Sequence, residues 1–176
     1  MDEELSLHIC CLDVGCGSGA LAIAVARRNP QGTVTGIDRW GAEYASFSKK
    51  LCEDNARSEG VAKRTVFAQG NALKLDYQDG TFDAVTSNYV YHNIPSHDRQ
   101  AILMETLRVL KKGGTFAIHD LFSQQKYGDM QAFVKKLKDL GYEQAELIPT
   151  DKGRFMSPWE AKWMALSGSA ILFGKR

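Results

Sequence analysis

A glycine-rich turn near the start of the sequence is the first feature that could do chemistry. It lies in the stretch "CCLDVGCGSGALAIAV", which runs from Cys10 to Val25. Gly15 and Gly17 carry no side chain, so backbone amides and carbonyls there can come very close to a ligand. The same stretch satisfies the loose G-x-G-x-x-A pattern of dinucleotide-binding turns. The glycines therefore predict a ligand-binding loop and leave the ligand open.

Asp13, two positions before the first glycine, separates the ligand classes. A dinucleotide would place a doubly charged pyrophosphate on this turn and on the N-terminus of the following helix. A carboxylate at the mouth of the turn would repel these phosphates and attract a cation. S-adenosylmethionine carries a sulfonium and an ammonium group, so Asp13 favours it over NAD.

Further polar residues follow the ends of other apolar segments. Asp38 can accept hydrogen bonds from both hydroxyls of a ribose. Trp40 offers either a flat apolar surface for adenine or a side chain that packs on the core. The others are Asn71, Asn88 and Asp120. Because the carboxyl ends of parallel strands meet at one edge of a sheet, these residues predict a single binding crevice.

Apolar segments alternate with amphipathic ones, which predicts strands joined by helices. We expect strands at 8–14, 33–38, 65–69, 82–88, 115–120, 143–148 and 170–174. The longer helices are expected from Gly19 to before Pro30, from Tyr44 to Gly60, from Ser96 to 111–114, and over 128–141. This order is typical of an α/β fold with a Rossmann-like, doubly wound sheet. The sheet should have seven strands, mostly parallel with an antiparallel last strand.

Composition narrows the class of protein. The net charge is +1, from 22 basic and 21 acidic residues. The protein therefore has no broad positive field that would attract a nucleic acid. The four cysteines form no C-x-x-C pair and no block with metal-ligand spacing. They are typical of reduced thiols in a cytoplasmic protein, and no metal site is expected. The longest apolar stretch is too short to cross a bilayer.

Five segments together resemble one family. "LDVGCGSG", "GIDRW", "GNAL", "FDAVTSNYVYHNI" and "ETLRVLKKGGTFAIHD", between about Ile9 and Leu121, resemble the class I S-adenosylmethionine-dependent methyltransferases. The likeness is to the small-molecule group that includes the ubiquinone and menaquinone biosynthesis enzymes. It implies transfer of a methyl group from S-adenosylmethionine to a small-molecule acceptor by in-line displacement.

The resemblance also implies which residues hold the cofactor. From the methionine end through the ribose and adenine to the acceptor side, these are Asp13, Gly15, Gly17, Gly19, Asp38, Arg39, Trp40, Asn71, Ala72, Asn88 and Tyr89. Asn71 stands where the family commonly has an acidic residue. Its amide oxygen can still accept a hydrogen bond from the adenine amino group.

No catalytic residue can be assigned from the sequence. Methyl transfer needs a general base only when the acceptor arrives protonated. The candidates are His92, His119 and Asp120. His92 is the best placed because it follows the fourth strand on the acceptor side, although histidines that bond to a nearby backbone group are commoner.

The family usually carries helices before the first strand that cover the cofactor. Only about eight residues precede that strand here. We therefore expect a single methyltransferase domain over 1–176 without the usual cap helices. An open site, a covering partner or homodimer, and a fragment of a longer, membrane-anchored protein are the alternatives.

The segment "RFMSPWEAKWMALSG" lies between the last two predicted strands. Ser157 with Glu160 forms a capping box, and Pro158 suits the first helical position. The helix would align an apolar face of Met156, Trp159, Trp163 and Leu166. Such a stripe predicts packing on the sheet, and the alternatives are an apolar wall for a lipid-like or aromatic acceptor, or a subunit contact.

Two other functions stay open at this level. An NAD-dependent oxidoreductase could use the same turn, but Asp13, the reversed last strand and the lack of a Tyr-x-x-x-Lys pair count against it. A non-catalytic, S-adenosylmethionine-binding regulatory subunit would share the whole cofactor site, because a fold alone does not fix a function.

Overall fold

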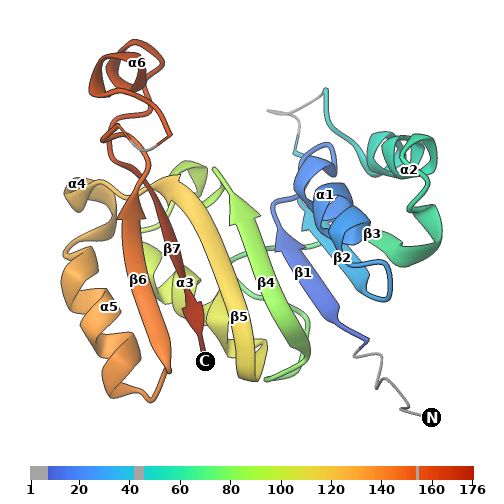
Figure 1. Ribbon diagram of the computed structural model, residues 1–176, viewed down its shortest axis with the longest axis horizontal. Helices are drawn as coiled ribbons and strands as arrows, with labels where there is room; N and C mark the ends of the chain where they lie inside the picture. Colours follow the sequence, from blue (N-terminus) through green and yellow to red (C-terminus); the bar gives the residue numbers. More distant parts are fainter. Residues whose placement is uncertain (1–7, 42–45, 154) are drawn as a thin grey trace.

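The chain folds around one seven-stranded sheet with strand order β3-β2-β1-β4-β5-β7-β6 (Figure 1). The computed structural model describes residues 8–41, 46–153 and 155–176. The strands are β1 (Cys10–Val14), β2 (Thr33–Asp38), β3 (Thr65–Gln69), β4 (Phe82–Asn88), β5 (Leu110–Leu121), β6 (Gln144–Pro149) and β7 (Ser169–Lys175). β7 runs antiparallel between β5 and β6, and the other pairings are parallel. The predicted fold class is confirmed.

The helices are α1 (Ala20–Arg28), α2 (Lys49–Ser58), α3 (Arg99–Arg108), α4 (Gln124–Tyr127), α5 (Met130–Asp139) and α6 (Pro158–Trp163), with short 3-10 turns η2 (Ala62–Arg64) and η3 (Tyr91–Asn93). Four of the six α-helices among the described residues, α2, α3, α5 and α6, begin at a residue whose side chain caps them. The Ser48 and Asp98 side chains accept hydrogen bonds from backbone N–H groups in the first turns of α2 and α3. Both helices therefore begin later than predicted. Tyr44, predicted within the first of them, lies outside the described residues.

Alternation along β1 places helices on both faces of the sheet. Cys11 belongs to a core cluster that includes buried residues of α1 and α2. Leu12 and Val14 belong to a second, larger cluster that includes buried residues of α3 and α5. The strands are therefore covered on both sides, and the C-terminal ends of the parallel strands form an edge where loops can build a site.

β5 is longer than predicted. It includes the "KKGG" stretch, which was expected to end the preceding helix, and its pairing with β4 shifts register between Phe82 and Ala84. Gly113 has φ +77° and donates its N–H to the carbonyl of the C-terminal residue, Arg176, at 2.5 Å. The chain end therefore holds this glycine turn within the strand.

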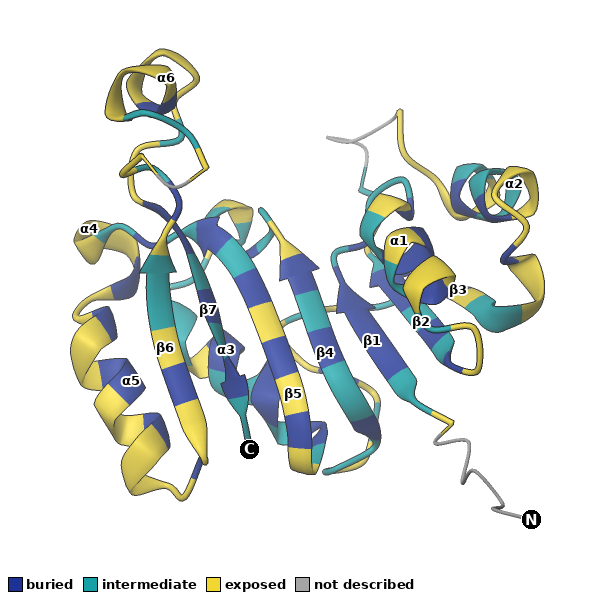
Figure 2. Cartoon of the chain, viewed as in Figure 1, coloured by how far each residue is buried: buried dark blue, intermediate teal, exposed yellow. Residues whose placement is uncertain are grey.

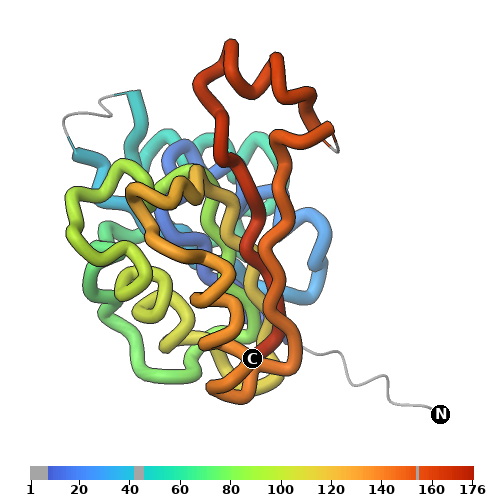
Figure 3. The backbone as a smooth tube through the Cα atoms, turned by 90° about the vertical axis from the view of Figure 1, so that its left-hand side faces the viewer, coloured from blue at the N-terminus to red at the C-terminus, as the bar shows by residue number. Residues whose placement is uncertain are grey.

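Residues 150–153 and 155–168, called here the α6 arm, project beyond the sheet (Figures 1 and 3). The capping box is confirmed, because the Ser157 hydroxyl accepts from the Glu160 N–H at 3.2 Å and the Glu160 carboxylate accepts from the Ser157 N–H at 2.7 Å. The predicted packing on the sheet is wrong, because the Trp159 and Trp163 side chains are 74% and 82% exposed. Most of α6 has the colour of exposed residues in Figure 2. Within α6 only Ala161 is buried.

Within the described part of the chain, every helix falls short of the length and apolar character that crossing a membrane requires.

Candidate functional site

A cavity of about 410 Å³ lies at the C-terminal edge of the strands. Its volume is in the range of about 300–1,000 Å³ that is usual for small-molecule sites. Most of the predicted cofactor residues line it, namely Asp13, Gly15, Gly17, Asp38, Arg39, Asn71, Ala72, Asn88 and Tyr89. Gly19 and Trp40 are not among the lining residues. The structure therefore brings the ends of four strands to one hollow.

The glycine loop lies close to β2 on one side and to the loop after β4 on the other. Gly15 has φ +73°, and its N–H donates to the Ile37 carbonyl at 2.8 Å. A Cβ atom at Gly15 would lie 2.3 Å from the side chain of Val90. No larger residue fits there without moving the loop after β4, so the glycine is required by both conformation and space.

Asp13 lies at the base of the cavity and is almost fully buried, with 1% exposure. Its Oδ1 accepts a hydrogen bond from the Thr86 hydroxyl at 3.0 Å, whereas Oδ2 has no partner among the described residues. Burial raises the pKa of Asp13 to about 7, although the Thr86 hydrogen bond opposes this. An unpartnered carboxylate oxygen in a dry site is costly. A positively charged ligand group would relieve that cost, so the site fits the ammonium-bearing end of S-adenosylmethionine.

Asp38 and Trp40 brace the glycine loop. Asp38 accepts hydrogen bonds from the Gly17 N–H at 2.8 Å and from the Trp40 N–H at 2.9 Å, each through a different carboxylate oxygen. The Trp40 indole N–H donates to the Gly17 carbonyl at 2.9 Å. A carboxylate has about four acceptor positions, so Asp38 keeps capacity for ribose hydroxyls. Trp40 instead supports the loop from outside the cavity.

Gly19 has a packing role in this structure. It is buried with φ +83°, and a Cβ atom there would lie 3.1 Å from the Phe67 ring and 3.3 Å from the Cβ of Cys52. The Cys52 thiol donates to the Gly17 carbonyl at 3.2 Å. Gly19 therefore lets α1 and α2 meet behind the loop.

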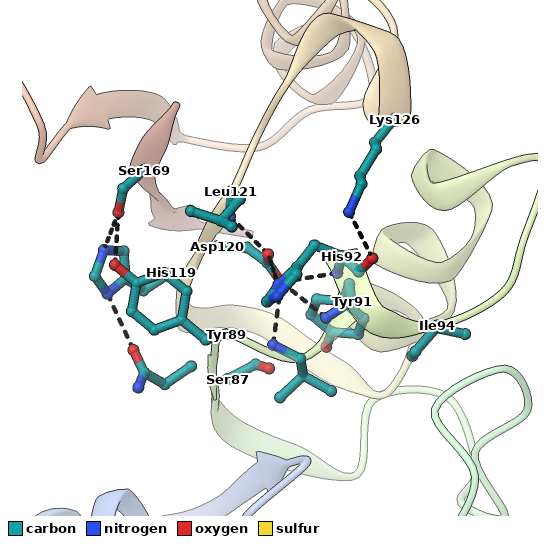
Figure 4. Close-up of polar contacts among 12 residues, drawn as sticks. Ser87, Tyr89, Tyr91, His92, Ile94, His119, Asp120, Leu121, Lys126 and Ser169 are labelled. Carbon is teal, nitrogen blue, oxygen red and sulfur yellow. Dashed lines mark hydrogen bonds and ion pairs between the residues drawn. The ribbon is translucent and has the colours of Figure 1, made fainter. Parts of the chain in front are cut away.

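A hydrogen-bond network extends from the cavity residues Asn88 and Tyr89 to the start of β7 (Figure 4). Tyr89 has φ +55°, an unusual conformation for a non-glycine residue that often marks functional sites, and its hydroxyl bonds to Ser169 at 2.7 Å. His119 contacts the Asn88 amide oxygen through Nδ1 at 3.0 Å. Its Nε2 contacts the hydroxyls of Ser169 and Thr150 at 2.9 and 3.1 Å. Burial lowers the pKa of His119. Through these contacts the His119 side chain connects β4 to β7.

His92 and Asp120 form a pair beside this network. His92 Nδ1 lies 2.6 Å from Asp120 Oδ1, and the Asp120 side chain is fully buried. Asp120 Oδ2 accepts from the N–H groups of Tyr91 at 2.8 Å and Val90 at 3.2 Å. The carboxylate therefore fixes the loop after β4 as well as the imidazole. The His92 ring stands edge-on to the Tyr89 ring, with 6.3 Å between centroids.

Several lining residues escaped sequence reasoning. They are mostly in loops and include Phe47, Leu73, Val90, Asn93, Ile94 and Pro95. Loops have no periodicity that marks which side chains face inward. Arg99 is the residue that could have indicated an ordered loop after β4. Its guanidinium donates to the carbonyls of Tyr91, Ile94 and Ser96 and so holds that loop.

Comparison with known proteins agrees with this geometry. A family model described as "Methyltransferase domain" matches residues 12–118. The 27-O-demethylrifamycin SV methyltransferase of Amycolatopsis mediterranei is 31% identical over 144 residues, which cover 80% of this chain and 49% of the relative. The demethylmenaquinone methyltransferase of Lactobacillus johnsonii is 36% identical over 111 residues, 61% of this chain and 41% of the relative. The chain thus spans half or less of the length of these relatives.

A solved structure of geranyl diphosphate methyltransferase in complex with S-adenosylmethionine superposes with a TM-score of 0.68. It covers 96% of this chain and 78% of its own, at 15% sequence identity. At that identity the likeness concerns the fold. Since the family model spans the cofactor loop and four further strands, the chain belongs to the family of S-adenosylmethionine-dependent methyltransferase domains.

Proposed function

We propose that this protein transfers a methyl group from S-adenosylmethionine to a small-molecule acceptor by in-line displacement. The observation that carries the proposal is Asp13. It presents a buried oxygen that has no partner among the described residues, at the base of a cavity lined by glycine backbone. The cofactor supplies a methyl group on a sulfonium, and the positive charge disappears as the group leaves. The protein's contribution is therefore mainly to hold the two reactants in line, an effect worth up to about 7–11 kcal/mol.

Each wall of the cavity has a proposed task. Asp13, Gly15 and Gly17 hold the methionine end, and Asp38 accepts hydrogen bonds from the ribose. Adenine lies between Arg39 on one side and Asn71 and Ala72 on the other. Phe47, which is 38% exposed and lines the cavity, supplies the aromatic surface first expected of Trp40. Asn88 and Tyr89 then lie where cofactor and acceptor meet.

Two features support further proposals, one on cellular location and one on oligomeric state. We propose that residues 1–176 act as one domain and that the protein works in the cytoplasm, since its four cysteines are free thiols. A second copy of the chain would cover exposed Trp159 and Trp163 of the α6 arm. Light scattering during gel filtration would measure the mass, and a monomer at micromolar concentration would contradict the dimer.

A labelling experiment tests the proposed activity. The protein is incubated with methyl-labelled S-adenosylmethionine and a low-molecular-weight cell extract, and labelled products are separated by chromatography. We expect at least one labelled product that is absent when the protein is left out and that decreases when S-adenosylhomocysteine is added in excess. Donor binding without any labelled product would favour the regulatory-subunit alternative.

A further inference from the structure

We propose that Asn88 donates a hydrogen bond from its amide nitrogen to a carboxylate or carbonyl oxygen of a bound ligand, and that His119 is the positioning residue that orients the amide. The inference rests on the proposed methyl transfer and defines the polarity of one wall of the same cavity. The oxygen belongs either to the carboxylate of S-adenosylmethionine or to the methyl acceptor. The starting observation is the contact of 3.0 Å between His119 Nδ1 and Asn88 Oδ1.

Sheet pairing holds the two side chains next to each other. Asn88, the last residue of β4, pairs with His119 of the parallel strand β5. Just beyond this pair, the Tyr89 N–H donates to the His119 carbonyl at 2.8 Å. The Tyr89 ring also packs on the His119 ring, with 4.5 Å between centroids (Figure 4). The imidazole is therefore fixed beside Asn88 by both backbone and ring contacts.

Two buried hydroxyl groups lie at the other nitrogen of the His119 ring. Nε2 is 2.9 Å from the Ser169 hydroxyl and 3.1 Å from the Thr150 hydroxyl. The Thr150 hydroxyl donates to Ser169 at 2.7 Å, and these two residues are only 2% and 1% exposed. A buried hydroxyl proton without an acceptor is costly. The proton of Ser169 therefore needs an acceptor inside this group of side chains.

One arrangement of protons gives every hydroxyl of the group an acceptor. Thr150 donates to Ser169, and Ser169 donates to Nε2 of His119. The Tyr89 hydroxyl, 2.7 Å from Ser169, donates to the second lone pair of the serine oxygen. A proton on Nε2 would instead turn the Ser169 proton to Tyr89, whose own proton would then have no acceptor among the described residues. Nε2 therefore accepts, and the neutral ring carries its proton on Nδ1.

The proton on Nδ1 determines which way the Asn88 amide faces. An imidazole N–H bonds to an acceptor, so the amide oxygen lies toward His119 and the amide nitrogen is left for a ligand. No described residue accepts a hydrogen bond from this nitrogen, and Asn88 is an exposed residue of the cavity lining. An NH2 group only donates. The cavity therefore offers an acceptor at Asp13 for a cation and a donor at Asn88 for an oxygen.

The first test reads the position of the proton on His119 without turnover. Nitrogen-15 spectra of histidine-labelled protein are recorded at pH 8, where the ring is neutral because burial lowers its pKa. They should show His119 protonated at Nδ1 and unprotonated at Nε2, and His119→Gln assigns the signals by their loss. Asn88→Asp should leave the tautomer unchanged, because a carboxylate also accepts from Nδ1. A wild-type proton on Nε2 would overturn the inference, since the amide nitrogen would then have to donate to the ring.

The second test removes the donor and keeps the contact with His119. Asn88→Asp replaces the amide nitrogen by an oxygen, which repels a ligand oxygen. Titration calorimetry compares S-adenosylhomocysteine with 5′-methylthioadenosine, which has the same nucleoside but no carboxylate. Gln131→Glu, at an exposed position of α5, is the control because it adds the same charge outside the cavity lining.

The two sources of the oxygen give different results. If the cofactor supplies it, Asn88→Asp should weaken binding of S-adenosylhomocysteine at least tenfold and of methylthioadenosine less than twofold, as expected for a hydrogen bond to a charged group. If the methyl acceptor supplies it, both nucleosides should bind within twofold of wild type, while product formation in the labelled-extract reaction falls at least tenfold. Equal losses for both nucleosides, or unchanged binding together with unchanged product formation, would contradict the inference.

Failure of the proposed function gives a different pattern. A wild-type protein that binds S-adenosylhomocysteine and forms no labelled product would contradict methyl transfer. The inference would then stand only with a loss of binding confined to the nucleoside that carries the carboxylate, and it would fall without that loss. A wild-type protein that binds neither nucleoside would contradict both.

Discussion

The two carboxylates nearest the glycine loop differ in what surrounds them. Asp38 is half-buried, and backbone N–H groups bond to both of its oxygens. Asp13 is buried, and one of its oxygens has no partner among the described residues. The unpartnered oxygen of Asp13 therefore carries a desolvation cost that a bound cation would remove. This contrast leads to separate predictions for the two residues.

Replacing Asp38 by Ala should weaken binding of S-adenosylmethionine by more than tenfold. The change removes the ribose acceptor and also releases Gly17 and Trp40, and a tenfold loss corresponds to about 1.4 kcal/mol. Titration calorimetry measures the affinity, with Asp54→Ala on the exposed face of α2 as control. An unchanged affinity would mean that the end of β2 does not hold the ribose.

Asp13 should make stability and donor binding depend on pH in opposite senses. Its pKa rises from 3.8 to about 7 because of burial. Between these values the folded protein keeps a proton that the unfolded chain releases, so stability falls as pH rises through this window. Donor binding needs the ionised form and should weaken below pH 7.

The substitution Asp13→Asn separates these two effects. It should raise the thermal midpoint of the ligand-free protein at pH 8, because no buried charge remains. It should also weaken S-adenosylmethionine binding, because the carboxylate is lost. Thermal unfolding and calorimetry at pH 6 and pH 8 check both parts. A variant that is less stable than the wild type and binds S-adenosylmethionine equally tightly would contradict the role assigned to Asp13.

At the scale of elements, the α6 arm and α5 show how one sequence pattern has two outcomes. Both carry apolar stripes at helical spacing, yet α5 buries Phe133 to 1% exposure while α6 leaves Trp163 at 82%. Periodicity states that a helix has an apolar face, but it does not state that a surface lies beneath it. The cap signals of α6 were local, and that part of its prediction was correct.

The exposed tryptophans should accordingly contribute little to the fold. In a sample dilute enough to be monomeric, Trp159→Ser and Trp163→Ser should each change the free energy of unfolding by less than about 0.5 kcal/mol, the usual limit for surface sites. Phe133→Ala, in the core under α5, should cost about 3–5 kcal/mol. Urea unfolding of the three variants compares them. A loss above 2 kcal/mol in either tryptophan variant would mean that the arm packs on the protein.

At the scale of the whole molecule, the sheet was predictable and parts of the site were not. Short apolar runs bounded by turns predicted all seven strands. Residues at the strand ends make up most of the predicted cavity lining, because the topology of the sheet brings those ends together. Of the two roles expected of Trp40, packing on the core is the one that the structure shows. The hydrogen bond from its indole to Gly17 was missed because it depends on a left-handed turn, with φ +43°. The loop over 93–95 was missed because Arg99, several residues later, sets its shape.

The central claim is that the buried carboxylate under the glycine loop selects a cationic sulfur nucleoside over a diphosphate. Calorimetric titration of the wild-type protein with S-adenosylmethionine and, separately, with NADH tests this claim most directly. The structure predicts saturable binding of S-adenosylmethionine and no binding of NADH at the same concentrations. Saturable binding of NADH, with no heat from the sulfur nucleoside, would contradict it.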